Sequence, residues 1–288
     1  MMHTDAALRL LDRGEVDAAP LHIDAASQLL EKAGPEARPY AGRWYQAASR
    51  PLRDRGLLSR AEQFLETARA RLPRDSTVLY ESGTLQELLA TNTVLPNIVY
   101  LPDLKAPPPS PQTSTLDSTV RVTREDIDDL KRRRAGQLNR AAVWLRESLA
   151  ADGSNMRARL HLGRVQSLRN QGDDALKLLR QASESQDPAI GYLALLFTGA
   201  VHEREGLLAA SVQDYRAAIE RFPLNHAAHI ALSAALQRSG RGDESRDILG
   251  RVVNSTAASR RDPWWTYLAE PASVNVGRLD LLRREARQ

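Results

Sequence analysis

A repeated pattern in the second half of the chain limits the possible folds more than any other feature. Three stretches that begin near residues 162, 198 and 232 align at a period of about 34 residues. Gly163, Gly199 and Ser233 share one column of this alignment. Three further columns hold small, large apolar and small residues in turn: Ala175, Ser211 and Ser245; Leu179, Tyr215 and Leu249; Ala182, Ala218 and Val252. Such a period indicates a stack of similar supersecondary units, because a single unit cannot bury its own apolar face.

Each unit is predicted to be a pair of helices joined by a tight turn. Gly206, Gly240 and Gly242 are placed to adopt the left-handed backbone that ends a first helix. Asp173 and Asp243 offer side-chain oxygens that can cap the second helix. Pro223 closes a unit, since proline does not continue a helix interior. The chain is therefore expected to be all-α.

The period and the order of small and large columns resemble the tetratricopeptide repeat. The best unit runs from Tyr192 to Asn225, an earlier unit covers residues 42–75, and a degenerate first unit ends near Gly34. The best unit matches the family at Gly199, Gly206, Tyr215, Ala218 and Pro223. The resemblance implies a right-handed α-α superhelix of about six helix pairs with a C-terminal capping helix. It also implies a noncatalytic scaffold or adaptor that binds a peptide or protein segment.

Composition divides the chain into four parts. One unit is split by a segment that contains six prolines, which favour extended or polyproline backbone. The first helix of this unit carries Gly83, and its second helix carries Ala141. The predicted parts are residues 1–91, helix pairs and the first helix of the split unit; 92–123, the insertion; 124–262, a long helix and repeats over 156–189, 192–225 and 226–259; and 263–288, the capping segment.

The proline-rich insertion has three possible roles. It can lie across the concave face as a built-in ligand, it can dock a partner through its prolines, or it can be a tolerated surface loop. Its first part, residues 94–101, is apolar enough that we expect it to pack against other residues.

The sequence DPWWTY follows the last repeat. Asp262 followed by Pro263 is a signal for the start of a helix. Trp264 and Trp265 are too apolar for a free surface, so we predict that they cover the exposed end of the stack. Repeats followed by DPWW and a helix of the type LLRRE are similar to those of a group of bacterial tetratricopeptide proteins.

The resemblance places partner binding on the concave side, which the first helix of each unit lines. The family's groove-facing columns correspond here to Arg43, Arg50, Arg53, Tyr80, Glu81, Thr84, Glu87, Arg157, His161, Arg164, Leu196, Phe197, Arg204 and Arg238. Guanidinium groups bind carboxylates well, so the predicted partner is an acidic or C-terminal segment. The alternative is a solvated face in a chain that is rich in arginine throughout.

Binding of chaperone tails is not expected. The version of the family that clamps a C-terminal carboxylate needs asparagines in fixed groove columns, and these columns hold Ala47, Arg50, Arg164 and Ala200 here.

A basic run at residues 131–134 raises a second hypothesis, a regulatory protein that contacts nucleic acid. An acidic turn that includes Asp128 and Asp129 comes directly before it. Opposite charges three and four residues apart pair along a helix, and no aromatic residue in the run supports base stacking. The run therefore favours a self-paired, solvated helix.

Catalysis and metal or cofactor binding form the third hypothesis. The chain has no cysteine, which excludes thiolate metal sites and thiol nucleophiles. His226 and His229 are three residues apart, but no acidic residue follows one turn later. No phosphate loop, nucleophile elbow or pair of carboxylates is present in a catalytic pattern. We therefore expect no enzymatic activity, no cofactor and no metal.

The net charge is +4 and the sequence pI is about 9.5, which implies at most weak attraction toward acidic partners. The longest apolar stretch, residues 189–201, is too short for a bilayer, which needs about 20 residues. The chain as written begins with an amphipathic pattern rather than a secretory signal, so a cytoplasmic location is expected. A signal lost through a misplaced start would instead imply a periplasmic or secreted protein.

Overall fold

The computed structural model describes residues 25, 28, 38–54, 56–92, 124–223, 225–254 and 262–267. Every regular element in these ranges is a helix, as predicted. The predicted first unit, most of the proline-rich insertion and residues 268–288 lie outside the described part of the chain. The helices are α3 (Arg38–Asp54), α4 (Leu58–Arg71), α5 (Ser76–Asn92), α6 (Arg124–Ala151), α7 (Met156–Leu168), α8 (Gly172–Ser183), α9 (Pro188–Arg204), α10 (Leu208–Arg221), α11 (Ala227–Arg238), α12 (Gly242–Asn254) and α13 (Pro263–Thr266).

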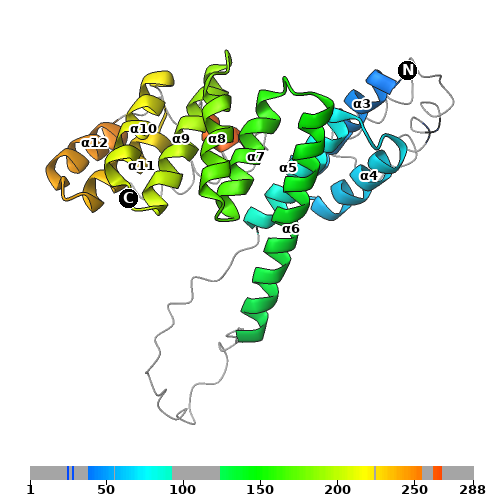
Figure 1. Cartoon of the computed structure of the whole chain (residues 1–288), viewed down its shortest axis with the longest axis horizontal. Coiled ribbons are helices and arrows are strands. Elements are labelled where there is room, and N and C mark those ends of the chain that lie inside the picture. The colour runs from blue at the N-terminus through cyan, green and yellow to red at the C-terminus, as the bar shows by residue number, and fades with distance from the viewer. Residues whose placement is uncertain are drawn as a thin grey trace, which may run out of the picture.

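Consecutive helices pair and the pairs stack side by side into an elongated solenoid (Figure 1). The described pairs run from α3 and α4 at one end to α11 and α12 at the other. The C-terminal half of α6 packs on α5, whereas its N-terminal half projects from the body of the stack. No helix in the described ranges combines the length and the apolar character that a membrane span requires.

The small-residue column marks the places where the two helices of a pair approach most closely. A Cβ atom added to Gly199 would lie 2.5 Å from the Tyr215 ring, and one added to Gly83 would lie 2.6 Å from Leu145 Cγ. Real Cβ contacts are not this short, so a larger residue would push the paired helices apart. The same column therefore allows the close approach of α9 to α10 and of α5 to α6.

The predicted left-handed turns are confirmed at two of the three glycines, whereas Gly242 begins α12, and the predicted caps are displaced. Gly206 and Gly240 both have φ +78°, the left-handed conformation that ends a helix. Asp173 lies in the first turn of α8, whose N-cap is Gln171. Asp243 likewise lies in the first turn of α12. Both carboxylates thus stabilise the helix dipole rather than bond as N-caps.

The predicted capping segment, residues 263–288, is described only as far as residue 267, so the prediction that Trp264 and Trp265 cover the end of the stack is not tested. Helix α13 packs against α9 in the middle of the solenoid, and Leu249 on the terminal helix α12 remains 41% exposed. Asp262 holds the start of α13 there, because its carboxylate accepts hydrogen bonds from the Tyr192 hydroxyl at 3.0 Å and from the backbone of His226 at 2.9 Å. These bonds turn the chain back into the concave face. The side chain of Trp265 lies outside the described part of the structure.

Candidate functional site: a central pocket and a covered cluster on the concave face

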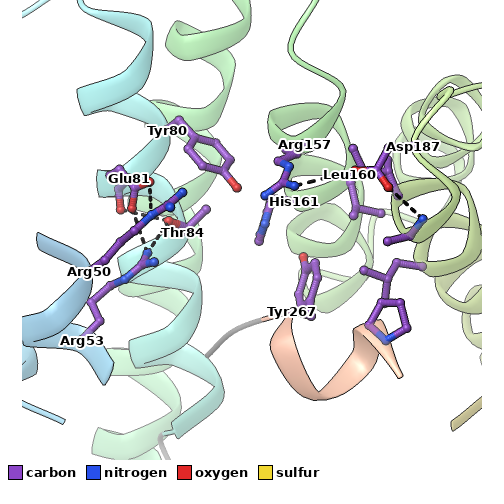
Figure 2. Close-up of a pocket in the computed structure, with 14 residues that line it drawn as sticks. Arg50, Arg53, Tyr80, Glu81, Thr84, Arg157, Leu160, His161, Asp187 and Tyr267 are labelled. Carbon is purple, nitrogen blue, oxygen red and sulfur yellow. Dashed lines mark hydrogen bonds and ion pairs between the residues drawn. The ribbon is translucent and has the colours of Figure 1, made fainter. Parts of the chain in front are cut away.

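A pocket of about 120 Å³ lies on the concave side between α3 and α5 on one wall and α7, α9 and residues 263 and 267 on the other. Figure 2 shows Arg50 and Arg53 reaching from α3 toward α5, with Arg157 and His161 on α7 and Tyr267 beside α13. We call this the central pocket. Its lining residues are Arg50, Arg53, Tyr80, Glu81, Thr84, Arg157, Leu160, His161, Asp187, Ala189, Ile190, Leu193, Pro263 and Tyr267.

Helix α5 supplies the polar core of the site. It lies between neighbouring helices on both sides, so nearly all of its residues from 78 to 90 are buried, polar ones included. Buried polar groups need hydrogen-bond partners inside the protein. Gln86 illustrates this, since its amide donates to Glu62 at 2.7 Å and accepts from Arg140 at 3.0 Å. Two carboxylates on the same helix, Glu81 and Glu87, face the concave side.

Glu81 is the centre of the first cluster, and its side chain is only 1% exposed. Gln46 donates a hydrogen bond to it at 2.7 Å, and Arg53 Nη1 lies 3.1 Å from its second oxygen. Arg50 Nε is 3.6 Å from the first oxygen. The same Arg53 nitrogen donates to the Thr84 hydroxyl at 2.9 Å. Two guanidinium groups therefore face one carboxylate at the edge of the central pocket.

Glu87 is the centre of the second cluster, and its side chain is fully buried at 0% exposure. His161 Nδ1 lies 2.7 Å from one carboxylate oxygen. The Tyr267 hydroxyl donates to the other oxygen at 2.9 Å, and Arg164 Nε lies 3.5 Å from that same oxygen. The Glu87 carboxylate thus binds a residue that follows it by 180 positions in the chain.

Aromatic rings enclose the charged groups of this second cluster. The Arg164 guanidinium carbon lies 4.7 Å from the Phe197 ring centre, 4.9 Å from that of Trp264 and 4.8 Å from that of Tyr267. The His161 ring stacks on Tyr267 at 4.5 Å with an interplanar angle of 16°. Cations bind favourably to ring faces at such distances, so the rings stabilise a guanidinium that has little access to water.

Burial keeps the two tyrosine hydroxyls of the site protonated. The pKa of Tyr80 is raised above its ordinary value, first by burial and then by the charge of Glu81. The pKa of Tyr267 is likewise raised by burial and by Glu87. Both hydroxyls therefore remain hydrogen-bond donors at neutral pH.

The structure divides the sequence-predicted groove residues into three groups. Arg50, Arg53, Tyr80, Arg157 and His161 line the central pocket. Glu87, Arg164 and Phe197 lie in the second cluster, which the aromatic rings enclose and which we call the covered cluster.

Arg43, Arg204 and Arg238 line neither, and all three are exposed. Arg204 donates to the Ser167 hydroxyl at 2.8 Å, and Arg238 pairs with Glu203 at 2.7 Å.

Several predicted groove arginines already have acidic partners within the chain. Arg157 lies 3.7 Å from Asp187, besides the pairs that Glu81 and Glu87 form. The face is therefore mixed in charge, because each acid lies on a helix next to the arginine that it neutralises. Sequence columns do not show this pairing. The contribution of Tyr267 was also missed, although the apolar WWTY sequence was a signal that this segment is buried.

The other candidate sites have local explanations. On α6, Lys131 lies 3.5 Å from Asp128, and Arg132 pairs with Asp129. His229 Nδ1 interacts with the Asn225 carbonyl oxygen at 2.8 Å. Among the residues that the structure describes, no group of three histidine or acidic side chains is arranged to hold a metal ion.

Comparison with known proteins identifies the repeat. A family model described as tetratricopeptide repeat matches residues 132–196. MamA from Desulfovibrio magneticus RS-1, solved from residue 41 to its end, is 14% identical with a TM-score of 0.51, over 74% of this chain and 93% of that one. PilF of Pseudomonas aeruginosa is 13% identical with a TM-score of 0.51, over 76% and 79%. At these identities the likeness is one of fold. No curated protein matches the chain.

Proposed function

We propose that this chain, whose residues 132–196 match the tetratricopeptide repeat model, is a noncatalytic interaction scaffold that holds a peptide or protein segment on its concave face. The finer proposal is that the segment is acidic or ends in a free carboxylate. The observation that carries it is the composition of the central pocket. Arg50 and Arg53 present guanidinium groups on one wall, and the other wall presents Arg157 with the apolar side chains of Leu160, Ile190 and Leu193.

This combination suits an extended segment that has one carboxylate and one apolar side chain. A carboxylate gains charge-assisted hydrogen bonds from guanidinium groups, and the apolar side chain is removed from water. Arg53 adds positive charge beside the pocket, although its Nη1 already lies 3.1 Å from Glu81.

The arginines differ in how available they are to a ligand. The Arg157 side chain is 58% exposed and its ion pair with Asp187 is long, at 3.7 Å. The Arg50 side chain is 32% exposed. Arg164 is only 13% exposed and is enclosed by rings. Arg50 and Arg157 are therefore the residues to test, and charge reversal of Arg164 would disturb the covered cluster as well.

The proposal is tested with two pools of fluorescein-labelled ten-residue peptides. One pool carries acidic residues and a free C-terminal carboxylate, and the matched pool replaces them with the corresponding amides. We expect fluorescence anisotropy to show binding of the acidic pool to the full chain and a loss of at least about tenfold in the R50E/R157E variant, equal to about 1.4 kcal/mol. R180E, an exposed change on the second helix of its pair, is the control and should bind normally. Equal binding of the two pools, or normal binding by R50E/R157E, would contradict the proposal.

A further inference from the structure

The segment Asp262–Tyr267 occupies the concave face in the manner of a bound peptide, and we call it the docked segment. It follows the last described repeat in sequence, and it contacts α5, α7 and α9 as well as the start of α11. Pro263 and Tyr267 also form one wall of the central pocket.

The first anchor of the docked segment is a carboxylate. Asp262 is buried, and one of its oxygens accepts from the Tyr192 hydroxyl at 3.0 Å. The other oxygen accepts from the backbone N–H groups of His226 and Ala227 at 2.9 and 2.8 Å. These groups belong to the start of α11, where free N–H groups and the helix dipole favour a negative charge. The anchor is a receptor for any suitably placed carboxylate.

The second anchor is a pair of aromatic side chains three positions apart. Trp264 meets the Phe197 ring edge to face at 5.9 Å and lies over Arg164. Tyr267 stacks on His161 and donates its hydroxyl to Glu87 at 2.9 Å. An indole and a phenol thus fill complementary positions along one helical turn.

The receptor side of both anchors is built without the docked segment. Glu87 of α5 is held by His161 and Arg164 of α7. Phe197 belongs to the hydrophobic core and lies on α9. If the docked segment left, Glu87 would keep two charged or polar partners. Arg164 would lose two of its three ring contacts and expose a guanidinium, whose Nη1 has no hydrogen-bond partner among the described residues. The vacated surface would therefore be a formed site.

We propose that the docked segment is an exchangeable resident ligand. In this proposal the surface formed by Tyr192, the start of α11, Glu87, His161, Arg164 and Phe197 binds a segment of another protein that carries an acidic residue followed by two aromatic residues one helical turn apart. The inference rests on the proposed function, since it assumes that the concave face receives peptides, but it concerns a neighbouring surface that shares only His161 with the receptor side of the Arg50 and Arg157 pocket. The occupant is defined by the resident chemistry: a carboxylate, an indole and a phenol.

Tethering determines how strongly the resident segment competes. A segment joined by a short linker has an effective concentration in the millimolar range at its own site. An untethered ligand of micromolar affinity would therefore be excluded from most molecules. Weakening the docked segment should raise the apparent affinity of an external one by about 100-fold.

The test uses full-length protein and a fluorescein-labelled synthetic peptide that covers residues 259–270 of this chain, which we call the tail peptide. The W264A/Y267A variant removes both aromatic anchors in cis and leaves the receptor side unchanged. We expect the peptide to bind this variant about 100-fold more tightly than it binds the unaltered chain. A matched peptide that lacks both aromatic side chains should not bind, and E87Q in the variant background should weaken the intact peptide.

Circular dichroism decides whether W264A/Y267A is folded. A folded variant that binds the peptide no better than the unaltered chain would overturn the proposal and make the segment a fixed part of the fold. The acidic peptide pool is measured on the unaltered chain, because Tyr267 also lines the central pocket, so that absence of tail-peptide binding to the variant with acidic-pool binding to the unaltered chain rejects only this inference. Absence of acidic-pool binding alone rejects only the proposed function.

A second experiment removes the need for destabilising substitutions. A site for a sequence-specific protease is introduced within residues 255–261, and the full chain is cleaved after it has folded. An exchangeable segment should separate from the rest of the protein on gel filtration at nanomolar concentration, and the synthetic peptide should replace it. Co-elution of both pieces at that concentration would contradict exchange.

Discussion

The two buried carboxylates of α5 have similar surroundings but differ in what lies over their clusters. Glu81 is held by Gln46, Arg50 and Arg53, and its cluster opens into the central pocket. Glu87 is held by His161, Arg164 and Tyr267, and the docked segment covers it. The two residues lie on the same helix, so the helix itself does not cause the difference.

The comparison shows that a distant segment decides which half of the groove is available. We call the cluster around Glu81 the open cluster. Its edge residue Arg50 extends partly into water, which lowers the desolvation free energy of its charge. In the covered cluster the charge of Arg164 depends on one acid and three rings. Breaking the covered cluster should therefore cost more stability than breaking the open one.

The largest expected effect follows removal of each acid. Glu87→Leu leaves Arg164 as an uncompensated buried charge and should reduce the free energy of unfolding by about 3–5 kcal/mol. Glu81→Leu leaves Arg53, which is 12% exposed, together with Arg50, which reaches water at 32% exposure, and should cost about 1–3 kcal/mol. Urea unfolding followed by circular dichroism measures both. An equal or larger loss for Glu81→Leu would show that the docked segment does not create the difference.

Removal of the indole comes next. Trp264→Ala deletes a ring that contacts Phe197 and Arg164, and it should cost about 2–4 kcal/mol, because the partly buried side chain leaves a cavity. The near-UV circular dichroism should change at the same time. The control is Trp144→Ala, which removes the ring of α6 that lies beneath Arg69 of α4. It tests whether loss of any tryptophan changes peptide binding. Only Trp264→Ala should increase binding of the tail peptide.

Tyr267→Phe isolates one hydrogen bond of the covered cluster. The ring stays on His161, but Glu87 loses the donor at 2.9 Å. A bond to a charged acceptor contributes about 1.5–3 kcal/mol, and Glu87 keeps two other partners, so we expect a loss near 1.5 kcal/mol in urea unfolding. A loss below about 0.3 kcal/mol would mean that water replaces the hydroxyl and that the cluster is not closed.

Alkaline pH provides a further test of the covered cluster. The pKa of Tyr267 is raised in the folded protein, whereas an unfolded tyrosine ionises near pH 10. Its contribution to stability is therefore complete below pH 10, and stability falls as the pH rises above 10, because the folded state then binds more protons. Tyr267→Phe should reduce this slope by about 1.4 kcal/mol per pH unit. An unchanged slope in pH-dependent urea unfolding would contradict the burial of this hydroxyl.

The smallest expected effect is at the open edge. Arg50→Ala removes a guanidinium that lies 3.6 Å from Glu81 and is 32% exposed. Exposed pairs contribute little, so we expect a loss of less than about 1 kcal/mol together with weaker binding of the acidic peptide pool. A large loss of stability without any change in peptide binding would make Arg50 a structural residue.

Much of the fold follows from local spacing. The small-residue column predicted the close approach of Gly199 to Tyr215, and glycine chemistry predicted the turn at Gly206. These features depend on neighbours within one repeat, and steric limits on the backbone act over that short range. The resemblance to the tetratricopeptide repeat assigned Arg50, Arg53 and His161 to the groove, and all three line the central pocket.

The availability of those positions depended on contacts between distant residues. The bond from Tyr267 to Glu87 joins residues 180 positions apart, and the carboxylate of Asp262 determines where the chain returns. A column of arginines predicts positive charge, but Asp187, Glu81 and Glu87 neutralise much of it. Helices and turns were therefore determined by the sequence pattern, whereas only the tertiary structure decided which half of the groove is open, since long-range pairing of buried charges has no local signal.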